Sequence, residues 1–274
     1  MITGSRGFLG ISVQRYFEDS NHSIIHFDIN DGDDILDSSK LIKKLEDVDL
    51  CVHLAAVADL YHAEEDKEKC YLINTEGTFR VAEACARMNV RLIFISTVCA
   101  YGNNGCKIQF EDSPLEPTEI YAETKALAEK KLTEVANLNF RIIRPATFYG
   151  PTMRESLAIH RFVKACKSNT TIEIHGLGNQ TRCYTHVDDV ASAILIIAEK
   201  WPPELIFNVA NSTSYSVNQI VEIIEQISGK ELDVVHVDDR EGQIFSSVIN
   251  VNRIMNLGWT PKYDINLGLT ELLL

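Results

Sequence analysis

Two short groups of residues in this chain have the types and spacing of a cofactor-dependent redox site. The first is the turn Gly4-x-x-Gly7-x-x-Gly10, which opens an amphipathic stretch. Such a turn presents backbone N–H groups at a helix N-terminus to a diphosphate, although an ordinary tight loop can carry the same glycines. The second is Tyr121-x-x-x-Lys125, a phenol and an amine one helical turn apart. Together they indicate proton and hydride transfer with a nicotinamide cofactor.

The Tyr–Lys pair suggests how a proton would move. A free tyrosine has a pKa of about 10 and is a weak base at neutral pH. The ammonium of Lys125, on the same helix face as Tyr121, favours the phenolate. Tyr121 could then accept the proton of a substrate hydroxyl. The plain alternative is a tyrosine and a lysine exposed on a helix, and the accompanying motifs argue against it.

An acidic residue follows the glycine turn at the distance that a dinucleotide site requires. Asp28 lies at the end of a predicted strand, about 20 residues after the turn. A carboxylate there accepts hydrogen bonds from ribose hydroxyls and repels a 2′-phosphate, so Asp28 favours NAD over NADP. The alternative is an aspartate that begins a loop by bonding to its own backbone.

The elements that must position these residues follow from the hydrophobic pattern. Short apolar runs alternate with amphipathic stretches, as in parallel strands joined by crossover helices. The predicted elements are strands at 24–27, 49–54, 90–96, 140–144 and 206–209, and helices at 72–88, 121–136, 187–199 and 217–228. Near-continuous apolar strands are typical of a sheet covered on both faces. We therefore predict an α/β fold with a doubly wound parallel (Rossmann) sheet and a smaller C-terminal substrate lobe.

The chain is expected to cross between two lobes. We assign residues 1–150 to an NAD-binding domain to which 187–210 return, and 151–186 and 211–274 to the substrate-binding lobe. Only Met1 and Ile2 precede Thr3, whereas strands usually have about five or six residues. The first strand is therefore expected to be truncated, and its neighbours to lose backbone partners.

Composition excludes several classes of function. A formal net charge of −13 argues against a nucleic-acid partner. The longest apolar run in a helical pattern, residues 193–198, is too short to cross a bilayer. Seven scattered cysteines contain no C-x-x-C pair, which indicates reduced thiols and no metal site. We expect a cytoplasmic protein with no metal and no membrane or nucleic-acid partner, and no signal peptide precedes the glycine turn.

The motifs together resemble a known family. Their order and spacing are similar to the extended short-chain dehydrogenase/reductases, specifically the NAD-dependent sugar-nucleotide epimerase/dehydratase branch, over nearly the whole chain. The residues that carry the resemblance are Thr3-Gly4-x-x-Gly7-x-x-Gly10, Asp28, Asp34-Ile35, His53-Leu54-Ala55-Ala56, Asn74-x-x-Gly77-Thr78, Ser96-Thr97, Tyr101-Gly102, Tyr121-x-x-x-Lys125, Arg144-Pro145, Tyr149-Gly150-Pro151, Arg182, His186-Val187-Asp188-Asp189 and Leu257-Gly258-Trp259-x-Pro261.

The resemblance implies NAD as cofactor and assigns residues to it. Asp34 and Ile35 should border the adenine, and Lys125 should also hold the nicotinamide ribose. The implied cofactor-binding residues are Gly4, Arg6, Gly7, Phe8, Leu9, Gly10, Asp28, Asp34, Ile35, Leu54, Ala55, Ala56, Asn74, Ser96, Tyr121, Lys125 and Pro145. Within this group we interpret Asn74 as mainly structural. We interpret the adjacent His53 as a core histidine.

The implied reaction centre is Thr97, Tyr121 and Lys125, with Thr97 bonding the reacting hydroxyl. The related 4,6-dehydratases carry an acid or an Asp-Glu pair directly after this threonine, where this chain has Val98-Cys99. A dehydratase is therefore disfavoured. The remaining options are 4-epimerisation through a transient 4-keto sugar and reduction of a 4-keto-6-deoxysugar. Asp28 favours the epimerase, since many reductases of the family use NADPH.

The substrate lobe departs from the family pattern, which leaves the sugar and the base open. Thr147 stands where epimerases usually carry Asn, Cys183 replaces an acidic residue, and Gln243 replaces an Asp. Arg182 and Arg240 remain and could clamp a nucleotide diphosphate, or form surface ion pairs. Thr147, Arg182 and Arg240 are thus the expected contacts to a nucleotide-diphosphate sugar.

Two further expectations concern roles outside the reaction centre. The pair Asp188-Asp189 opens a helix, and we interpret it as a helix cap with hydrogen bonds between lobes, not as catalytic carboxylates. The long helices suggest a homodimer. A non-catalytic NAD-binding sensor or assembly protein is the alternative from another class.

Overall fold

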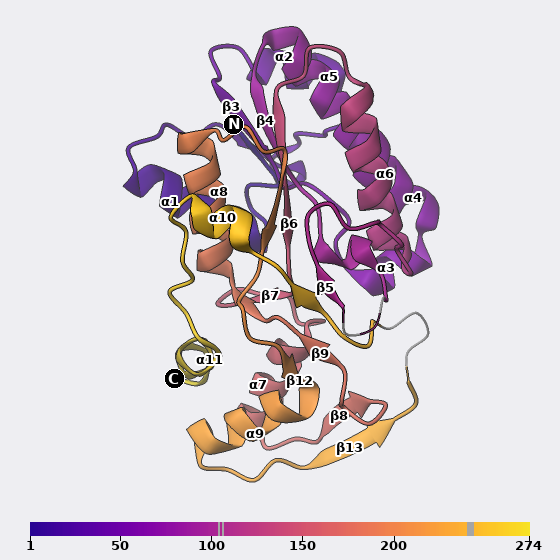
Figure 1. Ribbon diagram of the computed structural model, residues 1–274, viewed down its shortest axis with the longest axis vertical. Helices are drawn as coiled ribbons and strands as arrows, with labels where there is room; N and C mark the ends of the chain where they lie inside the picture. The colour runs from indigo at the N-terminus through magenta and orange to yellow at the C-terminus, as the bar shows by residue number, and fades with distance from the viewer. Residues whose placement is uncertain (104, 106, 240–243) are drawn as a thin grey trace.

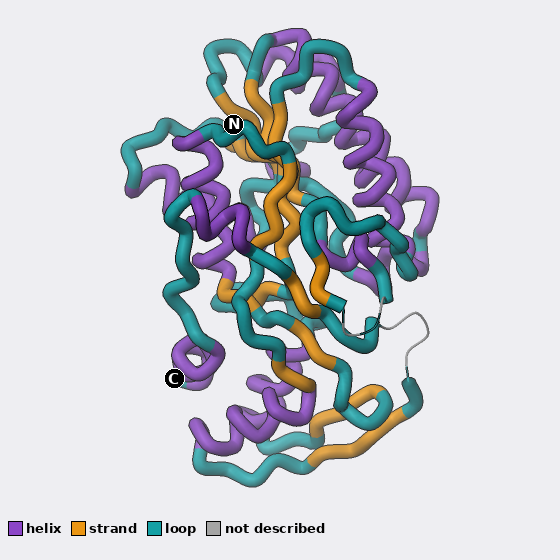
Figure 2. Tube along the Cα trace, viewed as in Figure 1, coloured by secondary structure: helices purple, strands orange, loops and turns teal. Residues whose placement is uncertain are grey.

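A six-stranded parallel sheet forms the centre of the protein (Figures 1 and 2). The structure is a computed structural model and describes residues 1–103, 105, 107–239 and 244–274. From one edge to the other the strands are β11 (Ile206–Val209), β6 (Phe140–Pro145), β4 (Arg91–Ile95), β3 (Leu50–His53), β1 (Ile2–Thr3) and β2 (His26–Phe27). The predicted doubly wound α/β fold is confirmed.

The strand order reverses where the sequence expects the cofactor. The chain runs from β1 outward to β2 and then crosses back over β1 to form β3. In such sheets ligands bind at the carboxyl ends of the strands where the order reverses. The glycine turn after β1 and the segment after β3 therefore flank the expected cofactor groove.

Helices cover both faces of the sheet (Figure 1). Helices α1 (Phe8–Asp19) and α8 (Val187–Lys200) pack on one face around a core that includes Val13 and Ile194. On the other face lie α2 (Ser38–Lys44), α5 (Thr78–Met88) and α6 (Ile120–Glu134). No helix within the described ranges is long and apolar enough to span a bilayer.

The helical stretch expected at 72–88 begins earlier and is not uniform. Helix α3 (Leu60–Glu65) is followed by α4 (Lys67–Tyr71), which Asp66 caps by accepting the N–H of Lys69 at 3.0 Å. The chain then continues through a π-helical segment, Leu72–Gly77, into α5. The sequence placed Asn74 near a helix start because it did not account for the cap at Asp66.

The first strand is two residues long, yet its neighbours are bonded to it. The N–H of Ile2 donates to the Ile25 carbonyl at 2.9 Å, and the N–H of Val52 donates to the Met1 carbonyl at 2.9 Å. The amino group of Met1 donates to the Leu50 carbonyl at 2.8 Å. The strand is as short as expected, but these groups of β2 and β3 do not lose their partners.

A smaller lobe is built mainly from the second half of the chain and has its own core, which includes Phe162 and Ile220. Its strands are short and form separate two-stranded sheets, and the two strands of each sheet come from distant parts of the chain. They are β5 (Ile108–Gln109) with β14 (Val248–Ile249), β7 (Phe148–Tyr149) with β10 (Thr185–His186), β8 (Ile172–His175) with β13 (Val234–Val237), and β9 (Thr181–Arg182) with β12 (Tyr215–Ser216), together with α7 (Ala158–Ser168), α9 (Val217–Ser228) and α11 (Ile265–Leu273).

The division into domains stays a prediction, and one segment crosses the assigned boundary. Helix α10 (Asn252–Asn256) lies against the sheet, and Ile254 and Trp259 belong to the core between the sheet and α8. The sequence assigned these residues to the substrate lobe. The chain leaves that lobe after β14 and returns to it with α11.

We predict that Gly10→Ala weakens both folding and NAD binding. A Cβ at Gly10 would lie 2.6 Å from the Ser5 carbonyl oxygen and closer still to that of Gly4, so α1 would have to move away from the turn. Melting temperature and calorimetric titration with NAD measure the two effects. Gly32→Ala is the control, because a Cβ there meets nothing within 4 Å and only the positive φ of 80° is strained. Equal behaviour of the two variants would contradict the close packing of α1.

Candidate active site

The glycine turn forms a cradle of backbone at the head of the cofactor groove. Gly4 has a φ of +66°, and a Cβ there would lie 2.8 Å from the backbone nitrogen of Ala55. The turn can therefore pack against the backbone that follows β3 only because Gly4 has no side chain. Gly7 precedes α1, whose N-terminus has no side-chain cap. Free amides at a helix N-terminus beside a turn of bare backbone fit a diphosphate.

Asp28 lies beside this cradle at the end of β2. Its Oδ2 accepts the N–H of Arg6 at 2.8 Å, and its Oδ1 accepts the N–H of Asn30 at 3.0 Å. Asp28 therefore does both things that the sequence left open: it bonds to its own loop at Asn30, and it lies next to the glycine turn at Arg6. The side chain of Arg6 is directed to Asp31, with 2.8 Å between Nε and Oδ2. Each carboxylate oxygen of Asp28 keeps a lone pair for a ribose hydroxyl.

The other expected cofactor residues divide into those that line the groove and those that support it. Leu54, Ala55 and Ala56 are half-buried after β3, and the N–H groups of the first two donate to Thr3 Oγ1 at 3.2 and 3.3 Å. Ile35, by contrast, is buried against Gly77 in the core under α5. The remaining members are buried or half-buried around the groove: Phe8, Leu9, Asp34, Ser96 and Pro145.

Asn74 holds the wall of the groove in place. Its Oδ1 accepts the N–H of Val57 at 2.8 Å, and its Nδ2 donates to the Val57 carbonyl at 3.0 Å and to Thr124 Oγ1 at 3.0 Å. Both amide hydrogens are therefore used within the protein. This geometry supports the structural interpretation of Asn74 over direct contact with the cofactor.

His53 is the core histidine that the sequence indicates. It has no exposed surface, and its ring nitrogens bond to Thr3 Oγ1 at 2.6 Å and to Thr78 Oγ1 at 3.0 Å. Burial, and then the nearby charge of Lys125, lower the pKa of His53 to about 3. It is neutral at physiological pH and has no free nitrogen for catalysis.

Thr97 and Tyr121 meet at the carboxyl end of β4. Thr97 caps the turn after this strand by accepting the N–H of Cys99 at 3.1 Å. Its side chain also lies close enough to the phenol of Tyr121, in the first turn of α6, to lower the pKa of that phenol. Burial and the neighbouring thiol of Cys99 raise the pKa of Tyr121 above its usual value of 10, while Arg154 and Thr97 lower it. Without a further positive charge the phenol stays protonated.

Lys125 lies one turn further along α6 and is almost completely buried, with 2% exposure. Its Nζ is 4.5 Å from the centre of the Phe94 ring. Burial lowers the pKa of Lys125 to about 7, and Glu129 and Cys70 oppose the shift. The three residues of the predicted reaction centre are thus brought together. The amine of Lys125 can gain or lose a proton near neutral pH.

A cavity of about 220 Å³ is lined by residues of both lobes, including Arg154, whose charge acts on Tyr121. Thr147 and Arg182, two of the predicted substrate residues, line it, whereas Arg240 lies outside the described residues. Arg154 and Arg161 also line it and were missed by the sequence analysis. In the sequence, only the position of Arg154 four residues after Gly150 could have indicated a place in the site. Its contacts with the other lobe cannot be read from the sequence.

Arg154 connects the cavity to the other lobe. Its Nη2 donates to the Ala58 carbonyl at 2.8 Å, and its Nε is 3.4 Å from Asp59 Oδ2. The departure at Cys183 has a local explanation, since its thiol contacts the Ser247 carbonyl at 3.4 Å. Gln243 lies outside the described residues. Among the residues that are described, no group of three or more His, Cys, Asp or Glu could hold a metal ion.

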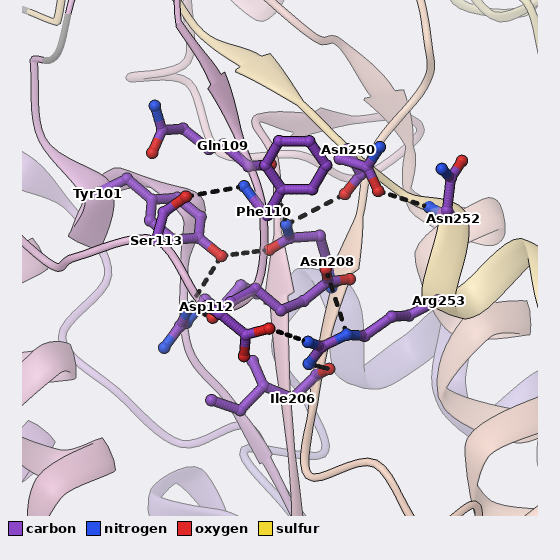
Figure 3. Close-up of polar contacts among 12 residues, drawn as sticks. Tyr101, Gln109, Phe110, Asp112, Ser113, Ile206, Asn208, Asn250, Asn252 and Arg253 are labelled. Atoms are coloured by element: carbon purple, nitrogen blue, oxygen red, sulfur yellow. Dashed lines mark hydrogen bonds and ion pairs between the residues drawn. The ribbon is translucent and has the colours of Figure 1, made fainter.

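A polar network joins Tyr101, Asn208 and Asn250 (Figure 3). Tyr101 donates from its hydroxyl to Asn208 Oδ1 at 2.7 Å, and Asn208 Nδ2 donates to the Asn250 carbonyl at 3.1 Å. Arg144 Nη1 donates to the Tyr101 hydroxyl at 2.8 Å. The network joins the turn after β4 to β6, to β11 and to the segment after β14.

The pair Asp188-Asp189 makes long-range contacts as expected, but the cap of α8 is His186, whose ring nitrogen accepts the N–H of Asp188 at 3.3 Å. Both lie in the first turn of α8, where acidic residues are favourable. The carboxylate of Asp189 accepts the N–H groups of Lys262 and Tyr263 at 2.7 and 3.1 Å, and Asp188 pairs with Arg15. These bonds hold the segment that leads to α11.

Comparisons with known proteins agree with this geometry. Residues 1–210 match the model of the NAD dependent epimerase/dehydratase family. The chain is 26% identical to a putative UDP-glucose 4-epimerase of Methanocaldococcus jannaschii, over 98% of this chain and 95% of that protein. It is 30% identical to the dTDP-D-glucose 4,6-dehydratase of Bos taurus, over 92% and 73%. A solved UDP-N-acetylglucosamine 4-epimerase of Methanobrevibacter ruminantium M1 superposes with a TM-score of 0.91 at 25% identity, over 99% and 96%.

We predict that Lys125→Met stabilises the protein near neutral pH while it damages NAD binding and turnover. Because the pKa of Lys125 falls from 10.5 to about 7 on folding, the folded state is penalised fully below pH 7 and less and less up to pH 10.5. The gain in melting temperature should therefore be largest below pH 7, decrease as the pH rises and vanish near pH 10.5. Lys130→Met, exposed on the same helix, is the control. A gain that does not depend on pH would contradict the buried amine.

Proposed function

Since this chain belongs to the NAD-dependent epimerase/dehydratase family, we propose that it is a nucleotide-sugar 4-epimerase that acts through a transient 4-keto sugar. The observation that carries the proposal is the contact of Thr97 with Tyr121 beside the buried Lys125. The similar proteins named as 4-epimerases of UDP-sugars support the same substrate class.

The cofactor that fits the cradle is NAD, which accepts a hydride from the sugar and later returns it. Gly4, Gly7 and Gly10 would hold its diphosphate, and Asp28 its adenosine ribose, which would exclude the 2′-phosphate of NADP. Lys125 would bond to the ribose next to the nicotinamide.

Tyr121 would take the proton of the sugar 4-hydroxyl as the hydrogen on the same carbon leaves as hydride. Thr97 would bond to the same oxygen and keep it in place during both half-reactions. The charge of Lys125, with that of the oxidised nicotinamide, would lower the pKa of the phenol enough for this transfer. In the return step Tyr121 gives the proton back, so the enzyme ends unchanged. Inversion requires that the hydride return to the opposite face of the sugar.

Residues 98 and 99 favour epimerisation over dehydration. Elimination of water from the sugar needs an acid and a base beyond Tyr121. The dehydratase relatives belong to the same family, but here the positions after Thr97 are Val98, which is buried, and Cys99. Neither supplies a carboxylic acid. Reduction of a 4-keto-6-deoxysugar is the second option, and Asp28 argues against the NADPH that many such reductases use.

Product identification with a panel of UDP-, GDP- and dTDP-sugars tests the function. We predict a C4 epimer from at least one sugar, and loss of turnover by at least the ~10²–10⁴-fold typical of a general acid/base in Tyr121→Phe. NAD binding should be nearly unchanged in that variant. A 4-keto-6-deoxy product would instead indicate a dehydratase. NAD binding without turnover of any sugar would indicate a non-catalytic sensor, and activity of Tyr121→Phe within tenfold of the parent would exclude the mechanism.

We further propose that the protein forms a twofold dimer through α6 and the helical stretch 67–88. Leu127 on α6 and Leu72 in the π-helical segment are exposed by 38% and 43%, and the two helical stretches lie side by side. Two copies could pair these faces as a four-helix interface. Light scattering should give twice the chain mass of 30.8 kDa, and Leu127→Glu should reduce it. A monomer at micromolar concentration would contradict the proposal.

A further inference from the structure

The helix that carries Tyr121 and Lys125 carries a third polar residue on the same face. Glu129 follows Lys125 by one helical turn, and residues at this spacing lie next to each other. Its side chain is 95% buried, in the layer between α6 and the sheet. The proposed mechanism does not use this carboxylate.

The carboxylate of Glu129 joins the two elements that bring the reaction centre together. Its Oε1 accepts the hydroxyl of Ser96 and, at 2.9 Å, the Nε of Arg144. Its Oε2 accepts Nη2 of the same arginine. Ser96 directly precedes Thr97 at the end of β4. A bond from α6 to Ser96 therefore sets the distance between the helix of Tyr121 and the strand end of Thr97.

Four of the five N–H groups of Arg144 donate hydrogen bonds, and these bonds hold it against Glu129. Its remaining Nη1 donates to the Tyr101 hydroxyl at 2.8 Å and to the Glu111 carbonyl at 3.0 Å. A carboxylate that receives three hydrogen bonds, two of them from a guanidinium, is fixed in position. Glu129 thus holds its charge in a fixed place.

This charge opposes the cost of burying Lys125. The groups that face the amine are Glu129 on α6, Cys70 on α4, His53 on β3 and the Phe94 ring on β4. A protonated His53 would repel the ammonium of Lys125. Among the other groups, Glu129 raises the pKa of Lys125 most and so opposes the effect of burial.

We propose that Glu129 is a positioning residue of the active site, which anchors the strand end of Thr97 to α6 through Ser96 and holds a negative charge one helical turn from Lys125. The proposal rests on the 4-epimerase function for its catalytic consequence only. Removal of the charge leaves Lys125 as a neutral amine over a wider pH range. The phenolate of Tyr121 then lacks its supporting cation.

Isotope-edited NMR of lysine side chains tests the electrostatic part without any substrate, with Lys125→Met to assign the signal. In the parent protein Lys125 should titrate near pH 7. In Glu129→Gln the ratio of ammonium to amine at a given pH should fall roughly tenfold or more. Glu134→Gln, exposed on the same helix, is the matched control and should titrate as the parent does.

A second variant covers loss of folding, because Glu129→Gln leaves Arg144 buried and unpaired. The double variant Glu129→Gln/Arg144→Met removes both charges and should show the same fall. An unchanged titration of Lys125 in either folded variant would overturn the electrostatic role.

Ser96→Ala tests the anchor separately. In this variant the pKa of Lys125 should equal that of the parent. The kcat should be lower, and the KM for the sugar should be nearly unchanged. Parent-like kcat would overturn the anchoring role. If the parent turns over no sugar, the proposed function fails, while the NMR titration still decides the electrostatic role of Glu129.

Discussion

The constraint on which the rest of this structure depends is the burial of a charged amine. Lys125 lies under α6 against the ring of Phe94, where moving an ammonium out of water costs several kcal/mol. Such a group is tolerated only where opposite charge and polar partners lie nearby. The layer between α6 and the sheet supplies the opposite charge through Glu129, which Arg144 in turn holds in place. The acid–base centre therefore comes with a polar network at its back.

The same helix also positions the cofactor groove. Asn74 bonds to Thr124, the residue before Lys125, and to the backbone of Val57 beyond β3. Direct hydrogen bonds through Asn74 therefore connect the wall of the groove to α6, the helix that carries Tyr121 and Lys125. Movement of this helix would disturb the cofactor site and the reaction centre at once.

Much of the sheet lobe could be predicted from the sequence, because its signals are local. Glycines at fixed intervals, a Tyr and a Lys at helical spacing and apolar runs of strand length each depend on neighbours within a few residues. The strand at 206–209 and the helix at 217–228 were predicted to the residue. The elements of the small lobe were harder, since six of its strands are two residues long and exist only where distant segments pair.

Residue types and spacing along the chain were therefore enough to establish the family and the cofactor class and to predict Thr97, Tyr121 and Lys125 as the reaction centre. The tertiary structure decided how these groups are charged and held. It placed Glu129 beside Lys125 and against Ser96, buried Ile35 under α5, and brought Arg154 from the small lobe to Asp59. Desolvation and long-range pairing depend on which segments meet in space, and the order of residues in a motif does not contain that information.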